Sequence, residues 1–388
     1  MKHSTTGTLT LALVWALVAW MRVAVACDLE TASAGCDPAV FDRQLRLNDI
    51  QAIGTHNSYK QSMPPAEWAA HHARDPQGAD GIDYGHRPIP EQLDHGARTI
   101  ELDVYYDPQG GRYAHPPGAL RKGYATPPWP AEAAAQMQRP GFKVMHLADI
   151  DFRSSCQTFV ACLTLIRDWS RAHPRHVPIM LLLNAKDGAS GPGAVAPLRF
   201  DERAFDALDA EVRSVFNPHE LIAPDDVQGQ YSSLRDAVLA GQWPTLGEAR
   251  GRLFFVLDED ARKVAAYRGK RRSLEGRVMF VNIDERSPAA AYLTLNDPLA
   301  EGPRIARDVA AGFLVRTRAD ADTVEARRDD THRREAAFAT GAQYVSTDYL
   351  QADPRFGDYR VRLPQGETAR CNPLRTPDCH RADRLTSP

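Results

Sequence analysis

A histidine and an asparagine stand side by side in the stretch Ile-Gly-Thr-His-Asn-Ser-Tyr, which spans residues 53–59. The imidazole of His56 can move a proton near neutral pH, and the side-chain oxygen of Asn57 can ligate Ca²⁺ or Mg²⁺. Glu101 and Asp103 point to the same side of a strand if Glu-Leu-Asp is extended, because strand side chains alternate. Their carboxylates are also hard oxygen ligands. These four residues could combine a general base with a metal site.

Five further polar residues stand at the ends of later apolar runs: His146, Asn184, Lys186, Arg316 and Arg318. A second histidine can act as a general acid, and an amide oxygen can complete a metal site. Lysine and arginine side chains can bind an anion, and the arginine fork suits a phosphate. Together these parts describe metal-assisted attack on a phosphodiester.

Eight short runs of strand-forming residues must position these side chains. They lie at residues 49–54, 98–103, 143–147, 178–184, 252–257, 277–282, 312–316 and 342–346. Several runs are continuously apolar, which is typical of parallel strands that are buried on both faces.

Helical patterns separate many of these runs, at residues 89–97, 156–172, 201–216 and 321–341. Alternating strands and helices predict an α/β fold, a (β/α)8 TIM-type barrel. The alternative is a doubly wound open sheet, which would need a glycine-rich phosphate turn after its first strand. In a barrel, the carboxyl ends of all strands meet on one face, and the polar residues above would gather there.

Each candidate also has a simpler explanation. A lone histidine after a strand is often a loop residue, and Glu101 with Asp103 could be a solvated turn. Lys186 could form a surface ion pair with Asp187, which contributes little stability. The two arginines could pair with nearby aspartates in the same way. A common position on one barrel face favours a shared site, because several unrelated causes would otherwise have to coincide.

The bulk composition is that of an ordinary globular protein. The chain has 388 residues, of which 43 % are hydrophobic and 25 % charged, and its net charge is −3. This charge gives no basic field for nucleic acid. Two long segments rich in Pro and Gly, 60–90 and 104–142, are expected to be functional or disordered loops.

The first 26 residues predict a secretory signal peptide. A short basic start precedes an apolar stretch and the small residues Ala24-Val25-Ala26. The alternatives are a retained membrane anchor, although Arg22 interrupts a short apolar run, and lipid attachment at Cys27. We therefore expect a secreted or periplasmic protein.

Six cysteines follow the predicted cleavage site, and an even number in an exported chain favours disulfides. Pairing of sequence neighbours gives Cys27–Cys36, Cys156–Cys162 and Cys371–Cys379, although six cysteines allow 15 connectivities. Residues 27–388 are expected to form a single barrel domain, with a disulfide-tied strap after about residue 363.

Six sequence blocks resemble the bacterial calcium-dependent phosphoinositide-specific phospholipases C, within the phospholipase-C-like phosphodiesterases. They are HNSY (56–59), ELDVY (101–105), HLADIDFRSSC (146–156), NAKDG (184–188), RTRADADT (316–323) and VSTDY (345–349). The resemblance covers roughly residues 48–372.

This resemblance implies that His56 is the general base and His146 the second catalytic histidine. It also implies that Asn57, Glu101 and Asp103 are calcium ligands, with Lys186 near the phosphate. An inositol hydroxyl would attack the phosphorus and release diacylglycerol and a cyclic inositol phosphate.

Two features depart from the family pattern. Asn184 stands where a further acidic ligand is common, so a charge is lost and calcium affinity should fall. The second histidine could also be His115, since it follows the acidic pair more closely than His146 does.

Three functions remain open from the sequence. The first is calcium-dependent cleavage of phosphatidylinositol or its headgroup diesters, by a monomer that contacts a membrane surface transiently. The second is a Mg²⁺-dependent phosphodiesterase for glycerophosphodiesters or sphingolipids, and the third is a non-catalytic binding barrel. Met63 and Trp68 are expected to form a lipid-facing lid beside the mouth of the barrel.

Overall fold

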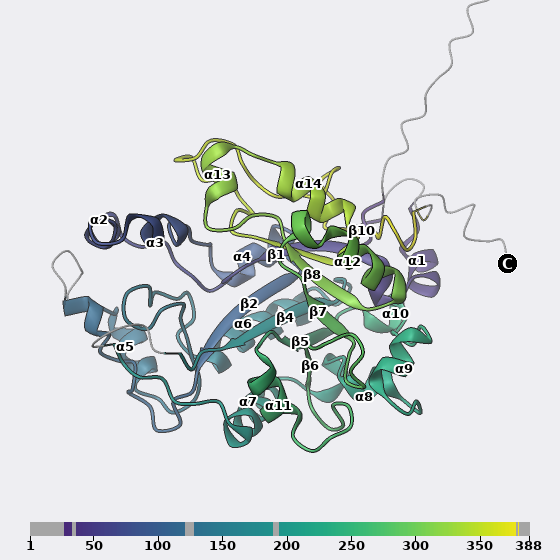
Figure 1. The fold of residues 1–388 in the computed structure, drawn as a ribbon, viewed down its shortest axis with the longest axis horizontal. Helices are drawn as coiled ribbons and strands as arrows, with labels where there is room; N and C mark the ends of the chain where they lie inside the picture. The colour runs from purple at the N-terminus through teal and green to yellow at the C-terminus, as the bar shows by residue number, and fades with distance from the viewer. Residues whose placement is uncertain (1–26, 33–35, 121–127, 189–193, 378, 380–388) are drawn as a thin grey trace, which may run out of the picture.

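The computed structural model describes residues 27–32, 36–120, 128–188, 194–377 and 379. Its centre is a nearly closed barrel of eight parallel strands (Figure 1), as predicted. The strands run in the order β6-β5-β4-β2-β1-β9-β8-β7, and the parallel bridge between Asn282 and Tyr292 joins the two ends. Their bounds are β1 Ile50–Thr55, β2 Thr99–Tyr105, β4 Ile179–Ala185, β5 Leu253–Leu257, β6 Met279–Val281, β7 Tyr292–Thr294, β8 Leu314–Arg318 and β9 Tyr344–Thr347.

The barrel strands form where the sequence is continuously apolar. In β4 the run from Ile179 to Leu183 is wholly buried, as expected for a strand with the barrel interior on one side and helices on the other. Burial of each such side chain contributes about 1.5–3 kcal/mol relative to exposure. The open-sheet alternative is therefore not the fold of this chain.

One predicted barrel strand is wrong. The run at 143–147 contains only the two-residue strand β3, Lys143–Val144, which pairs antiparallel with the end of β2. The barrel instead uses β7, a three-residue strand that the sequence pattern did not reveal. Three residues are too few to show a periodicity, and β7 is defined by its pairing with β8.

Helices surround the barrel. The predicted helices at 156–172 and 201–216 are confirmed as α6 Phe159–Ala172 and α7 Glu202–Val215, capped by Thr158 and Asp201. The others are α1 Pro38–Gln44, α4 Ile89–Asp94, α8 Pro224–Gln228, α9 Leu234–Leu239, α10 Leu246–Ala249, α11 Ala261–Arg268 and α12 Pro298–Ala311, with 3-10 turns at Leu47–Asp49 and Pro218–Glu220.

The single helix predicted at 321–341 is two helices, α13 Val324–Arg328 and α14 His332–Ala339. Asp329 separates them with a φ of 50°, in the left-handed region that interrupts a right-handed helix. This interruption lies in the sequence Arg-Asp-Asp-Thr, where aspartate tolerates the left-handed conformation better than most residues.

The two long segments predicted as loops contain short helices. Residues 60–90 include α2 Pro65–His72 and α3 Pro76–Gly81, which lie together away from the strands in Figure 1. The described part of 104–142 contains a 3-10 turn at Pro117–Leu120 and helix α5 Ala131–Met137. Both segments follow the carboxyl end of a barrel strand, on the face where the candidate site lies.

The three predicted disulfides are confirmed: Cys27–Cys36, Cys156–Cys162 and Cys371–Cys379. In the tail, β10, Ala369–Cys371, pairs antiparallel with β1. Disulfides of this kind are typical of oxidising compartments. The predicted signal peptide lies outside the described residues. Within the described residues, no helix is both long and apolar enough to span a bilayer.

Candidate active site

Polar side chains gather at the carboxyl ends of the barrel strands. His56 and Asn57 follow β1, Glu101 and Asp103 lie within β2, and Asn184 lies at the end of β4. The register of β2 and β4 places Asp103 directly opposite Asn184. The parallel barrel therefore brings together residues that are far apart in the sequence.

His56 is held by two neighbouring elements. Its Nδ1 lies 2.7 Å from Oδ1 of Asp348, which follows β9, and 3.2 Å from the hydroxyl of Tyr84. Burial, and after it the Arg318 guanidinium, lower the pKa of His56 to about 3, against the opposing effect of Asp348. The ring is therefore neutral at neutral pH.

The tautomer of His56 follows from the charge of its partner. Arg318 holds the pKa of Asp348 below its ordinary value, although burial alone would raise it, so Asp348 is a carboxylate and accepts hydrogen bonds. The proton of the neutral ring then lies on Nδ1, and Nε2 carries the lone pair. Nε2 lies 3.6 Å from Oε1 of Glu101, where it can accept a proton from a bound hydroxyl.

Asn57 adopts a left-handed backbone conformation, with a φ of 48°. Asparagine is one of the few residues that tolerate this region. Its amide nitrogen donates to the hydroxyl of Tyr84 at 2.8 Å, and its side-chain oxygen accepts from Tyr59 at 3.3 Å. The oxygen of the buried Asn57 is thus oriented as an acceptor.

Glu101 is buried and has two partners. Its Oε2 accepts from Arg316 at 2.6 Å and its Oε1 from the amide of Asn184 at 3.1 Å. Burial raises the pKa of Glu101 to about 7, although the Arg316 guanidinium opposes this. Arg316 is 2 % exposed, so in this structure its guanidinium serves the carboxylate rather than the cleft.

Asp103 lies 2.8 Å from the ammonium of Lys186 and is 1 % exposed. Neither of its carboxylate oxygens has a hydrogen-bond partner of good geometry within the described residues. A buried carboxylate with unused acceptor capacity can act as a ligand of a cation. The described residues contain no ready-made metal cluster of three or more His, Cys, Asp or Glu side chains, but the candidate set contains two carboxylates and two amides.

His146 follows β3, which pairs antiparallel with the end of β2, and its Nδ1 lies 2.8 Å from Oδ2 of the buried Asp151. A cleft of about 480 Å³ brings His146, His56 and Arg318 to one space, together with Tyr84 and Asp348. His115, the alternative second histidine, is exposed and is not among the residues that line this cleft. The geometry therefore favours His146.

Four further residues complete the surroundings and were not candidates from the sequence: Lys60, Tyr84, Asp151 and Asp258. Asp258 follows β5 and accepts from Asn282 at 2.9 Å, and burial raises its pKa. Asp348 was noted at a strand end but given no role. Contacts between segments that are distant in the sequence define Lys60, Tyr84, Asp258 and Asp348, so no local pattern could have revealed their roles. Asp151 lies only five residues from His146.

The lipid-facing lid predicted at Met63 and Trp68 is not supported by their burial. Met63 is buried, and the indole of Trp68 donates to the carbonyl of Ala79 at 3.2 Å and stacks on His72. The half-buried Trp68 therefore links α2 to α3, and Met63 is not exposed for contact with a lipid.

The fold and the cleft place this chain among the parallel barrel proteins whose polar residues lie at the carboxyl face of the strands. The sequence profile described as "Phosphoinositide phospholipase C, Ca2+-dependent" matches residues 45–373. The chain therefore belongs to this family of calcium-dependent phospholipases C, and it is an enzyme of the phosphodiester hydrolase class. The resemblance seen in the six sequence blocks is confirmed.

A solved structure agrees on the fold, and a second is less similar. The calcium-dependent phosphoinositol-specific phospholipase C of a Gram-negative Pseudomonas species, in its apo form with myo-inositol, has a TM-score of 0.52 at 17 % identity, covering 88 % of this chain and 99 % of that chain. A Ca²⁺-dependent phosphatidylinositol-specific phospholipase C from Streptomyces antibioticus has a TM-score of 0.48 at 18 % identity, covering 78 % of this chain and 95 % of that chain. A comparison with curated protein sequences finds no match.

Proposed function

We propose that this protein cleaves phosphatidylinositol, or a diester of its headgroup, by acid–base catalysis between His56 and His146. The observation that carries this proposal is the cleft that both histidines line, in which each Nδ1 lies within 2.8 Å of a buried carboxylate. Two histidines held in this way each present Nε2 for proton transfer.

The proposed reaction transfers one proton to His56 and one proton from His146. His56 Nε2 takes the proton of an inositol hydroxyl as its oxygen forms a bond to phosphorus. His146, when it carries a proton on both ring nitrogens, gives its Nε2 proton to the glycerol oxygen as the bond from phosphorus to that oxygen breaks. The products are diacylglycerol and a cyclic inositol phosphate.

Arg318 is the proposed anion-binding side chain in the cleft. It lines the cleft beside both histidines, and its Nε has no hydrogen-bond partner among the described residues. Its NH2 group donates to Asp348 at 2.9 Å, so the same guanidinium can face a phosphate and orient the partner of His56. Lys186 is the second proposed phosphate contact, and Arg316 would act through Glu101.

Asn57, Glu101, Asp103 and Asn184 are the proposed ligands of a calcium ion. When bound, the ion would neutralise charge that develops on the phosphate oxygens. Two carboxylates and two amide oxygens suit Ca²⁺, which accepts several oxygen ligands in flexible geometry. The family favours calcium over the magnesium alternative. Lys186 and Arg316 already contact the two carboxylates. These cationic side chains would therefore have to move away from Asp103 and Glu101 when the ion binds.

The enzyme is proposed to be exported and to work at a membrane surface. Export through the predicted signal peptide accords with the three disulfides, and transient contact with a membrane surface accords with a phospholipid substrate. Leu120, at the end of the 3-10 turn after β2, is 90 % exposed and is a candidate lipid contact. We expect the enzyme to act as a monomer.

The deciding experiment is incubation of the purified mature chain with phosphatidylinositol, with Ca²⁺ or with a chelator, followed by ³¹P NMR of the product. Calcium-dependent formation of a cyclic inositol phosphate is expected, and His56→Ala and His146→Ala should each abolish it. If the enzyme turned over glycerophosphodiesters or sphingolipids but not phosphatidylinositol, the substrate would be one of those compounds and not phosphatidylinositol. Absence of turnover on all three with Ca²⁺ or Mg²⁺ would favour a binding barrel.

A further inference from the structure

Lys60 is a fully buried lysine that has three acceptors around its ammonium group. Its Nζ donates to the carbonyl oxygens of Ile82 at 2.9 Å and Tyr84 at 2.6 Å, and lies 3.3 Å from Oδ2 of Asp151. A buried ammonium is costly unless it is paired and hydrogen-bonded. These three contacts satisfy its three N–H donors.

The acceptors of Lys60 lead to both histidines of the cleft. Asp151 contacts Nδ1 of His146 through the same Oδ2 atom, at 2.8 Å. Tyr84 contacts Nδ1 of His56 through its hydroxyl, at 3.2 Å. Lys60 is thus one residue removed from each histidine, on two separate paths.

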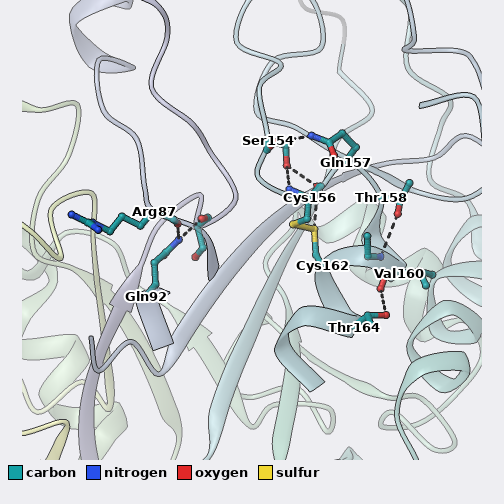
Figure 2. The surroundings of a disulfide bond; sticks show 11 residues. Arg87, Gln92, Ser154, Cys156, Gln157, Thr158, Val160, Cys162 and Thr164 are labelled. Atoms are coloured by element: carbon teal, nitrogen blue, oxygen red, sulfur yellow. Dashed lines mark hydrogen bonds between the residues drawn. A yellow bond between two sulfur atoms is a disulfide. The ribbon is translucent and has the colours of Figure 1, made fainter. Parts of the chain in front are cut away.

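The backbone joins the same segments. The amide of Lys60 donates to the carbonyl of Asn57 at 2.8 Å and closes the turn that follows His56. Lys60 also forms an antiparallel bridge with Ser154, in the loop that carries Asp151. The Cys156–Cys162 disulfide connects this loop to α6, as Figure 2 shows, and restrains the same loop.

The charge of Lys60 favours the ionised form of Asp151. Burial alone would raise the pKa of Asp151, but the Lys60 ammonium and His146 hold that pKa below its ordinary value. Asp151 is therefore a carboxylate, and it accepts the Nδ1 proton of His146. This arrangement leaves Nε2 of His146 for the cleft.

We propose that Lys60 is a positioning residue, whose ammonium holds Asp151 against His146 and Tyr84 against His56, and so sets how the two histidines face each other. This inference rests on the proposed function, because it assigns the acid–base pair to these two histidines. Lys60 contacts neither imidazole ring, yet it would explain why both rings face the same cleft.

Lys143 offers a matched control. It too is fully buried, lies 3.1 Å from a carboxylate oxygen of Asp107, and donates to the backbone carbonyls of Arg139 and Gly141. It is not among the residues that line the cleft. Lys143→Met should therefore reproduce the cost of removing a buried, ion-paired lysine without moving the histidines.

The test compares Lys60→Met with Lys143→Met on a soluble short-chain phosphatidylinositol at saturating Ca²⁺. Lys60→Met should lower kcat about 10- to 100-fold, which is less than the roughly 10²–10⁴-fold that a general acid or base itself contributes, with little change in KM. Lys143→Met should keep kcat within about 3-fold. Equal kcat values in the two variants would overturn the proposal.

A second readout does not need turnover. Histidine ¹⁵N NMR of the full chain, at a pH where His146 is neutral, reports which ring nitrogen carries the single proton, and the Nδ1–H form is expected. In Lys60→Met the His146 signal should shift toward a mixture of tautomers, whereas in Lys143→Met it should stay. An unchanged signal in Lys60→Met also overturns the proposal. If Lys60→Met does not fold, Lys60→Gln, which keeps hydrogen-bond donors but lacks the charge, decides the question by the same two criteria. Absence of turnover in the wild type would remove the proposed function but leave this NMR comparison valid.

Discussion

Nδ1 of His56 lies 2.7 Å from Oδ1 of Asp348, and the two residues are 292 positions apart in the sequence. The contact exists because β1 and β9 are neighbours in the barrel, with Thr55 opposite Thr347. Each histidine of the cleft therefore has a carboxylate partner on its Nδ1. For His56 the partner comes from the far end of the chain, and for His146 it comes from five residues away.

Replacing Asp348 with asparagine should lower kcat by about 10²–10⁴-fold with little change in KM. An amide cannot hold the Nδ1 proton of His56 as a carboxylate does, so the ring loses its tautomer and its orientation. Steady-state kinetics on phosphatidylinositol measure both constants. Asp358→Asn, at an exposed position on the following loop, should leave kcat unchanged. A kcat within 3-fold of wild type in Asp348→Asn would contradict the role of this carboxylate.

Replacing Lys186 with methionine should increase affinity for Ca²⁺ by about tenfold, which corresponds to 1.4 kcal/mol. The ammonium lies 2.8 Å from Asp103, and its removal leaves a buried carboxylate without a counter-charge. Isothermal titration calorimetry measures the affinity directly. The control is Lys263→Met, which removes another ion-paired lysine, 2.7 Å from Glu259. Weaker calcium binding in Lys186→Met would mean that the ammonium does not compete with the ion.

Replacing Asn184 with aspartate should increase calcium affinity but destabilise the metal-free protein by about 1–3 kcal/mol. The amide donates to Glu101 at 3.1 Å, whereas a carboxylate there would repel Glu101. Thermal unfolding with chelator and with Ca²⁺ should show the two effects with opposite sign. Asn282→Asp is the control, because that amide also donates to a carboxylate, Asp258, at 2.9 Å. It should destabilise the protein without a gain in calcium affinity, and an equal gain would argue against Asn184 as a ligand.

Replacing Glu211 with glutamine should change how stability depends on pH. Burial raises the pKa of Glu211 from 4.5 to about 7, against hydrogen bonding from Phe142 and the charge of Lys143. Between pH 4.5 and 7 the folded state therefore binds a proton that the unfolded state does not, and stability falls as pH rises through this window. The loss should reach roughly 2–3 kcal/mol above pH 7.

The measurement is denaturant unfolding at pH 5 and pH 8 with the disulfides intact. Glu211→Gln lacks this titration, so its stability relative to wild type should rise between the two values. Glu132→Gln, at an exposed position on α5, should show no such difference. A parallel pH dependence in Glu211→Gln and wild type would show that Glu211 is ionised throughout this range.

The barrel could be predicted from local sequence wherever a strand is long and continuously apolar. β4 is the clearest case, since five consecutive apolar residues are buried there. β7 could not be predicted, because three residues carry no period and its place depends on pairing with β8. The barrel strand predicted at 143–147 was wrong in the opposite way. Its residues Lys143–Val144 do form a strand, but this strand pairs antiparallel outside the barrel.

Residue types and their positions at strand ends determined most of the candidate site. His56, the two carboxylates and the amides could be named from the sequence, because parallel strands bring their carboxyl ends to one face. His146 was named from a predicted barrel strand, but it follows β3, which pairs antiparallel outside the barrel. The near pairing of all three disulfides also followed from sequence separations of 6 to 9 residues.

Only the tertiary structure decided which charges meet. Arg316 is directed to Glu101 and Lys186 to Asp103, whereas Arg318 reaches Asp348 and lines the cleft. The choice between His146 and His115 likewise depended on a cleft formed by distant segments. The physical reason is that hydrogen bonds and ion pairs act over a few ångströms in space, whereas sequence patterns report burial and local backbone preference.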